Sequence, residues 1–398
     1  MRSERKERER EEQRVSPRRS RKAKGNTDSK FCKILSIIYS VLMIIFVALL
    51  MVLNILPTLM LVLLLIALLV GSIFIVPVLY SPRGKADRKK KMKVVALILV
   101  LLLGVANYYL VSTINFLGHI SNYIDTGATD RGESHVDVTK ETFNVFVSGI
   151  DVRGDISEIV SRSDVNMVVT VNPKSREVLI TSIPRDYYVE LPSYGAMDKL
   201  THAGIYGPEE SIAAIENLLD IDINYYAKVN FSTVVSLVDA IGGIDVTTEE
   251  AFDTHKTGNI YHFDAGVNHI DGEQALAYCR ERQSWIDGDM RRNENQQVVL
   301  EAVINKLTKG PVILYKYPAI LDAIKGTVET DMNKDDMTDL IKMQLGDMRG
   351  WDISKQAIKG TPDFAYCYAS DCSASVVMPD TNSVNNAIAA INDVSERE

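Results

Sequence analysis

Cysteine and histidine are scarce in this chain, which holds four cysteines and six histidines among its 398 residues. They do not stand at the Cys/His spacings of a zinc site, so the sequence gives no reason to expect one. Cys367 and Cys372 are five residues apart and could form a disulfide if that part of the chain lies in an oxidising compartment.

Apolar residues are almost missing from residues 1–30, which are mainly Arg, Lys, Glu and Ser. Such a composition cannot bury a core, so we expect a disordered arm. A secretory signal peptide is excluded, because no small-residue cleavage site follows a single short apolar core. The arm also lacks a helix-turn-helix pattern. Anionic lipid headgroups explain its basic charge without a nucleic-acid partner.

Charged residues are nearly absent from three long apolar runs, at about residues 31–53, 58–80 and 94–117. Each run reaches the length of about 20 residues that a helix needs to cross a bilayer. Arginine and lysine gather in the arm and again in residues 81–93. The positive-inside rule therefore predicts a three-pass protein with a cytoplasmic N-terminus, and it places everything after residue 118 outside the cell.

The part beyond residue 118 is acidic, which argues against nucleic-acid binding there. Residues 118–141 are polar and predict a linker. Three strands are then expected, at 144–150, 165–171 and 177–183. Asp151 ends the first strand, Asp164 precedes the second and Arg185 follows the third. The two acids could meet beside the sheet as oxygen ligands for Mg²⁺, although Asp164 could equally cap a helix or pair with Arg162.

Residues 280–297 hold four arginines, two aspartates and two adjacent glutamines. Arg280 and Arg282 are two apart, so in an extended segment both point the same way. Arg292 and Gln296 are four apart and share one helix face. Because the planar guanidinium group matches phosphate oxygens, this stretch indicates binding of an anion with more than one phosphoryl group. A surface salt-bridge network is the alternative.

An ordered set of short motifs now becomes informative. It comprises Gly149-Ile-Asp151, Arg162-Ser-Asp164, Ser182-Ile-Pro-Arg185-Asp186, Lys199-Leu, Asp239-Ala-Ile-Gly242-Gly243-Ile-Asp245, Gly272-Glu-Gln-Ala-Leu276, Arg280-Glu-Arg282 and Gly288-Asp289-Met-Arg-Arg292. In this order the motifs resemble the LytR-CpsA-Psr family over about residues 143–309. The resemblance implies an α/β fold: an extracytoplasmic α-β-α domain with a mixed central sheet over 142–309, preceded by three transmembrane helices. Beyond residue 309 the resemblance fades. Residues 310–380 are expected to extend the domain, as helix to residue 358 with a strand-like break at 327–332 and then as a strand pair over 360–380, and residues 381–398 are expected to form a short helix and a frayed tail.

The resemblance also implies an activity and its residues. Members of the family are membrane-anchored phosphotransferases of Gram-positive-type envelopes, which move an anionic glycopolymer from an undecaprenyl-pyrophosphate carrier to peptidoglycan through a phosphodiester link. Asp151 and Asp164 would hold Mg²⁺ or Mn²⁺. The pyrophosphate would be bound by Arg162, Arg185, Lys199, Arg280, Arg282, Arg292 and Gln296. The catalytic residues would be Asp151 as base, Arg185, and Asp289, which would orient the arginines.

Two other functions remain open from the sequence. One is a hydrolase that cleaves the polyprenyl pyrophosphate with water as acceptor. The other is a non-catalytic membrane protein with a lipid-binding or regulatory role.

Overall fold

The computed structural model describes residues 30–80, 86–125, 136–150, 161–255, 259–285, 288–308, 312–347 and 349–397. The predicted arm therefore lies, apart from Lys30, outside the described residues. By its contacts the chain divides into two compact units, Met1–Ser112 and Thr113–Glu398.

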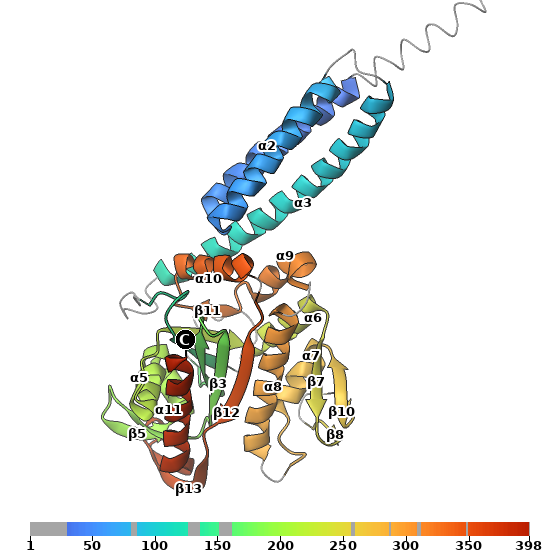
Figure 1. The fold of residues 1–398 in the computed structure, drawn as a ribbon. Helices are drawn as coiled ribbons and strands as arrows, with labels where there is room; N and C mark the ends of the chain where they lie inside the picture. The colour runs from blue at the N-terminus through green and yellow to red at the C-terminus, as the bar shows by residue number, and fades with distance from the viewer. Residues whose placement is uncertain are drawn as a thin grey trace, which may run out of the picture. The chain divides into compact units, whose positions relative to one another are not determined.

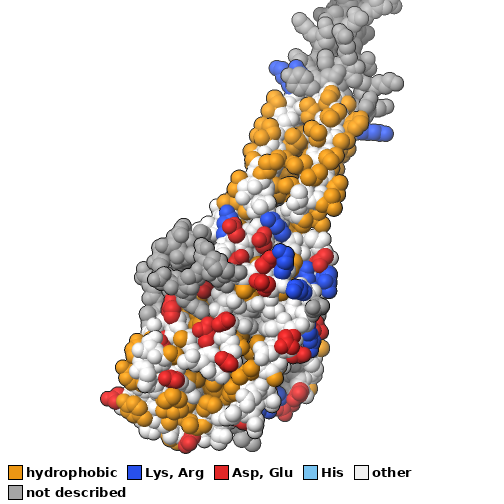
Figure 2. Space-filling model, turned by 60° about the vertical axis from the view of Figure 1, so that its left-hand side comes forward, with side chains coloured by type: hydrophobic (Ala, Val, Ile, Leu, Met, Phe, Trp, Pro, Cys, Tyr) orange, Lys and Arg blue, Asp and Glu red, His pale blue; other side chains and the backbone are white. Residues whose placement is uncertain are grey.

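The first unit contains long apolar helices. Three stretches are long and apolar enough to cross a membrane: Lys30–Leu53, Thr58–Leu79 in helix α2 (Thr58–Tyr80), and Lys90–Gly118 in helix α3 (Ala86–Asp125). Hydrophobic side chains cover their surface (Figure 2). The Asn107 side chain donates to the Leu42 carbonyl oxygen at 3.1 Å, a polar contact between helices of the kind that stabilises membrane bundles.

Helix α3 is longer than the sequence predicted. It begins at Ala86, so most of the basic stretch over residues 81–93 is helical, and it continues to Asp125 into the predicted linker. Lysine, arginine and methionine are good helix formers, so the basic stretch extends the apolar helix rather than interrupting it.

A six-stranded sheet forms the centre of the second unit (Figure 1). Its strands, in spatial order, are β11 (Val328–Thr330), β6 (Tyr225–Asn230), β1 (Phe143–Ile150), β2 (Val165–Asn172), β3 (Glu177–Ile183) and β12 (Asp352–Ala357). The pairs β1·β6 and β3·β12 are parallel, and the other neighbours are antiparallel. The sheet is therefore mixed.

Helices cover both faces of this sheet, as the alternating side chains of β3 show. Leu179 and Ile183 pack in a core cluster with α5 (Pro208–Leu219) and α11 (Thr381–Glu396). Val178 and Ile180 point the other way and pack with side chains of α8 (Gly288–Thr308). A strand buried on both faces reads as a continuous apolar run. The predicted α-β-α domain with a mixed sheet is confirmed.

Further elements complete the second unit. The helices and turns are α4 (Leu200–Ala203), η1 (Gly204–Tyr206), α6 (Phe231–Ile241), α7 (Gly272–Arg280), α9 (Val312–Ile324), α10 (Lys334–Asp347) and η2 (Tyr368–Ser370). Two-stranded pairs are formed by β4 (Tyr188–Leu191) with β5 (Ala196–Lys199), β7 (Ile244–Thr248) with β10 (Gly266–Ile270), β8 (Phe252–Asp253) with β9 (His262–Phe263), and β13 (Gly360–Cys367) with β14 (Cys372–Pro379).

Beyond residue 309, strand β11 lies at the expected break in the helical stretch, and β13 and β14 form the expected strand pair, whereas β12 falls within residues expected to be helical. Strands β11 and β12 form the two edges of the central sheet. The expected short helix at the end of the chain is α11, which takes up nearly all of the expected tail, and its Val384, Ala387, Ile391 and Val394 belong to the main core cluster. These residues recur at helical spacing, which lays one apolar stripe on the sheet.

Cys367 and Cys372 are cross-strand partners at the end of the β13–β14 hairpin. The structure has both as free thiols, with Cys367 buried and Cys372 exposed.

Candidate functional site

Two side chains meet where strands β2 and β3 lie side by side. Asp164 immediately precedes β2 and Arg185 follows β3, and the antiparallel register brings the start of one strand to the end of the other. Nη1 of Arg185 donates to Oδ1 of Asp164 at 2.7 Å. About a quarter of each side chain is exposed, so the pair remains accessible from a cavity.

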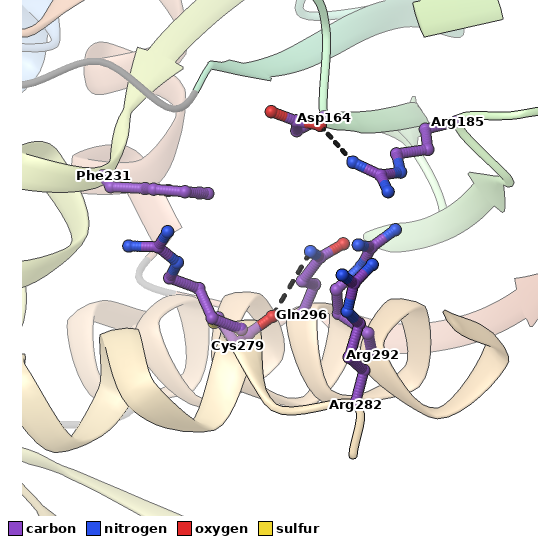
Figure 3. Close-up of a pocket in the computed structure, with 8 residues that line it drawn as sticks. Asp164, Arg185, Phe231, Cys279, Arg282, Arg292 and Gln296 are labelled. Carbon is purple, nitrogen blue, oxygen red and sulfur yellow. Dashed lines mark hydrogen bonds and ion pairs between the residues drawn. The ribbon is translucent and has the colours of Figure 1, made fainter. Parts of the chain in front are cut away.

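Helices α7 and α8 supply the opposite side of that cavity. Arg280 is the last residue of α7, Arg282 follows it, and Arg292 and Gln296 share one face of α8. The cavity has a volume of about 150 Å³, and its described lining residues are Asp164, Arg185, Phe231, Cys279, Arg280, Arg282, Arg292 and Gln296. We call it the arginine cavity. Figure 3 shows Asp164 and Arg185 on one side and Arg282, Arg292 and Gln296 on the other.

Charge is unevenly distributed in the arginine cavity. Four guanidinium groups and one carboxylate line it among the described residues. Arg292 is buried, with 8% of its surface exposed. A guanidinium group that has lost most of its water gains from a bound anion, and phosphate can accept two parallel hydrogen bonds from it. The cavity is therefore suited to an anion with several oxygens.

Phe231 contributes an aromatic wall that the sequence did not predict as part of the site. The Arg280 guanidinium carbon lies 5.1 Å from the centre of the Phe231 ring, a cation–π contact. Phe231 is the first residue of α6, and Asn230 before it caps this helix by accepting from the Thr233 backbone N–H at 2.8 Å. The cap fixes where the phenyl ring stands and hence where Arg280 points.

Glu281 orders the backbone that follows helix α7, including that of Arg282. Its carboxylate is buried and accepts backbone N–H groups of Arg282 at 2.9 Å, Ser284 at 3.1 Å, and also Gln283 and His255. Burial by itself would raise the pKa of Glu281, but these backbone hydrogen bonds together outweigh it and lower that pKa. The sequence analysis gave Glu281 no role beyond its place in the Arg280-Glu-Arg282 motif.

Comparisons with known proteins show which family the chain belongs to. The sequence model described as "LytR_cpsA_psr family" matches residues 111–386, well over half of the chain. The chain belongs to this family. It is 35% identical over 260 residues to a polyisoprenyl-teichoic acid–peptidoglycan teichoic acid transferase TagU of Halalkalibacterium halodurans. The aligned part covers 63% of this chain and 83% of that protein.

Solved structures of the same group share the fold. TagV of Bacillus subtilis superposes with a TM-score of 0.52 at 27% identity, over 65% of this chain and 99% of that one. A structure titled "TagT bound to LI-WTA" superposes with a TM-score of 0.53 at 25% identity, over 68% of this chain and 99% of that one. The predicted resemblance to the LytR-CpsA-Psr family is confirmed.

Lys199 is not among the described residues that line the arginine cavity. Its Nζ is 3.2 Å from Oδ1 of Asp186, and Oδ2 of Asp186 is 3.5 Å from Nε of Arg185. Asp186 therefore links Lys199 to Arg185 in the cavity wall. The sequence interpretation named Asp186 only as part of a motif.

The remaining predicted residues are not brought into the cavity by the described structure. Arg162 is exposed and is not among the described lining residues. Asp151 lies outside the described residues, and of Asp289 the structure describes the backbone in α8 but not the side chain. The roles predicted for these three residues stay predictions.

Among the described residues that line the arginine cavity, one is acidic and could bind a metal ion. Within the described ranges, no group of three or more His, Cys, Asp or Glu side chains gathers as a metal site. Asp164 alone presents a carboxylate, with its second oxygen pointing away from Arg185 (Figure 3). Mg²⁺ usually takes one or two carboxylates and completes its shell with water and substrate phosphates. The donor set thus fits an ion that arrives with a phosphorylated substrate.

Proposed function

We propose that this chain transfers a wall glycopolymer such as teichoic acid from a polyisoprenyl-linked carrier to peptidoglycan. The observation that carries the proposal is the arginine cavity, in which Arg185, Arg280, Arg282 and Arg292 converge from segments about 100 residues apart. The family membership and the printed names of the relatives support the same activity.

The carrier end would be a diphosphate, as in an undecaprenyl-pyrophosphate glycopolymer. Its oxygens accept hydrogen bonds from the arginines, with Gln296 beside them. An acceptor hydroxyl oxygen attacks the phosphorus next to the polymer, and the bond from that phosphorus to the bridging oxygen breaks. Polyprenyl phosphate leaves, and the polymer becomes joined to the acceptor by a phosphodiester. The proton of the hydroxyl passes to a base, for which Asp151 remains our prediction.

Electrostatics would supply most of the rate enhancement. Phosphoryl transfer needs positioned cations where charge develops on the transferred and leaving oxygens, and little covalent help. Guanidinium groups that are already fixed do not have to reorient during the reaction. Arg280 is fixed by Phe231 and Arg185 by Asp164, while Glu281 orders the backbone of Arg282.

We propose further that a divalent ion, Mg²⁺ or Mn²⁺, binds with the substrate. Asp164 would hold it, together with Asp151 as the sequence predicts. The ion would neutralise charge on the diphosphate oxygens. Arg185 keeps the Asp164 carboxylate oriented through their 2.7 Å contact, so its removal would weaken metal binding as well as substrate binding.

The three apolar helices suit a membrane anchor that keeps the domain near a lipid carrier. We propose the orientation that the basic residues predict, with the N-terminus in the cytoplasm and the domain on the outer side of the cell membrane, in a Gram-positive-type envelope.

The test is incubation of the full chain in detergent with a pyrophosphate-linked lipid glycan, Mg²⁺ and a peptidoglycan oligomer, followed by mass spectrometry. The proposal expects polymer linked to the oligomer by a phosphodiester, and expects its loss in Arg185→Ala and Asp164→Ala. Free polymer phosphate as the only product would instead identify a hydrolase. Lipid binding that falls in both variants, with no turnover in the unaltered chain, would identify a non-catalytic binder.

A further inference from the structure

A second cavity adjoins the arginine cavity and leads to the β13–β14 hairpin. The two cavities share Arg185 and Arg292. The second has a volume of about 370 Å³, and Pro362, Ser375 and Val377 of the hairpin form part of its wall. The base of the hairpin is therefore continuous with the space in which the diphosphate would react.

One face of this hairpin is open and aromatic. Directly opposed residues share a face, and the register pairs Phe364 with Ser375 and Tyr366 with Ser373. Phe364 is 75% exposed and Tyr366 is 54% exposed. Hydrophobic side chains gather at the lower end of this unit in Figure 2, the end where Figure 1 places β13. We call Pro362, Phe364, Tyr366, Ser373 and Ser375 the hairpin face; Val377, opposite Pro362, packs against the main core cluster.

The opposite face of the hairpin is held against the domain, so the hairpin face is preformed. Cys367 and Val376 on that side are buried. The Tyr188 hydroxyl donates to the Tyr366 carbonyl oxygen at 2.8 Å, and the Ala369 backbone N–H donates to the buried carboxylate of Asp198 at 2.6 Å. A fixed surface loses little conformational entropy when a ligand binds.

The chemistry of the hairpin face matches a saccharide. A sugar ring has a face of C–H groups, which are attracted to the negative face of an aromatic ring, and a rim of hydroxyls that need hydrogen-bond partners. The exposed rings of Phe364 and Tyr366 can contact the C–H face of a sugar. The serine hydroxyls can form hydrogen bonds with the sugar hydroxyls, and so can Asp371, which accepts from the Tyr366 hydroxyl at 2.6 Å.

Charge identifies which saccharide would bind. Residues 360–379 contain Asp363 and Asp371 but no lysine or arginine. An anionic polymer or an anionic lipid surface needs cations, and this hairpin offers none. From Pro362 to Tyr366 the face runs about 13 Å, longer than one sugar ring. An uncharged glycan chain is the occupant that these features favour.

We propose that the hairpin face binds the glycan strand of the peptidoglycan acceptor and directs one of its hydroxyls through the second cavity to the arginine cavity. The inference rests on the proposed transferase function, because it assigns the acceptor of that reaction. It separates the two substrates in space: cations bind the donor, and aromatic rings bind the acceptor.

The experiment measures binding of the full chain, in detergent micelles, to peptidoglycan sacculi stripped of wall polymers. Phe364→Ala/Tyr366→Ala removes both rings, and Phe364→Tyr/Tyr366→Phe keeps them. Ile260→Ala/Val267→Ala is the matched control, because both side chains are large, apolar and highly exposed, at 77% and 73%, but lie elsewhere. We expect the first variant alone to raise the Kd for sacculi and the KM for acceptor about tenfold or more. Its Kd for a polyprenyl diphosphate should stay unchanged.

Equal binding of sacculi by the first variant and the control would overturn the inference while leaving the transferase function intact. An unaltered chain that self-associates through these rings, with no ring-dependent binding of glycan, would overturn it in favour of a dimer contact. Ring-dependent binding of sacculi without any linked product would have the opposite meaning: the hairpin face would stand, and the transferase function would fail.

Discussion

Two neighbouring arginines in α8 allow a sharp test of the arginine cavity, because only one of them lines it. Successive residues of a helix are about 100° apart. Arg292 lines the arginine cavity, whereas Arg291 is directed to acids elsewhere, 3.2 Å from Glu294 and 3.4 Å from Glu249. Arg292→Ala and Arg291→Ala thus delete the same side chain from adjacent positions with different consequences.

The size of the effect follows from what Arg292 would contribute. Hydrogen bonds to a charged group are worth about 1.5–3 kcal/mol, and each 1.4 kcal/mol is about tenfold in rate or affinity. Arg292→Ala should therefore lower kcat/KM for glycopolymer transfer about 10- to 150-fold. Arg292→Lys keeps the charge but loses the planar guanidinium fork, so its kcat/KM should lie between those of the unaltered chain and Arg292→Ala. Arg291→Ala removes partly exposed ion pairs and should change kcat/KM by less than about twofold.

The assay is steady-state transfer to a peptidoglycan oligomer, with thermal unfolding recorded for every variant. Arg292 is largely buried, so its truncation also removes packing. A fall in activity at an unchanged Tm supports the binding role. If Arg291→Ala and Arg292→Ala lose activity equally, or if activity follows Tm across the variants, the arginines act through folding and the reasoning is refuted.

Two substitutions and one labelling experiment test the supporting structure. Because folding lowers the pKa of Glu281, its carboxylate stabilises the fold at pH values above the unfolded pKa of about 4.5, and this stabilisation is lost as pH falls through the lower folded pKa. In Glu281→Gln, the unfolding free energy measured with urea should therefore fall less steeply at acid pH. An unchanged acid dependence would exclude this role of Glu281. Ile391→Ala in α11 should cost about 2–5 kcal/mol of unfolding free energy, because Ile391 is buried in the main core; a loss below about 1 kcal/mol would mean that α11 is not part of that core. Burial raises the pKa of the Cys279 thiol to about 12. Near pH 8 a thiol reagent should therefore modify the exposed Cys372 of the native chain before Cys279, which peptide mapping would show. Modification of Cys279 first would contradict the burial of Cys279.

The sequence predicted the parts of the site that depend on local pattern. Runs of apolar residues placed β1, β2 and β3 to within a residue or two, and the antiparallel register then brings Asp164 to Arg185. The spacing of four between Arg292 and Gln296 placed both on one face of α8. For Arg280 and Arg282 the prediction of an extended segment was wrong in part, because Arg280 ends helix α7 and extended backbone begins at Glu281.

Other parts depend on contacts that no local pattern records. Phe231 lies in the arginine cavity because α6 begins beside it, and Glu281 matters through backbone N–H groups, one of them from a residue 26 positions earlier. The edge strand β12 carries polar and charged residues, so its sequence does not resemble a strand. The exposed rings of the hairpin face also read as ordinary strand residues until the register places them beside the second cavity.

The most direct measurement is a crystal structure of the chain with a polyprenyl diphosphate and Mg²⁺. We expect both phosphoryl groups inside the arginine cavity, with oxygens in hydrogen-bond contact with Arg185 and Arg292 and the metal on Asp164. Phosphoryl density on another surface, with the arginine cavity empty, would contradict it.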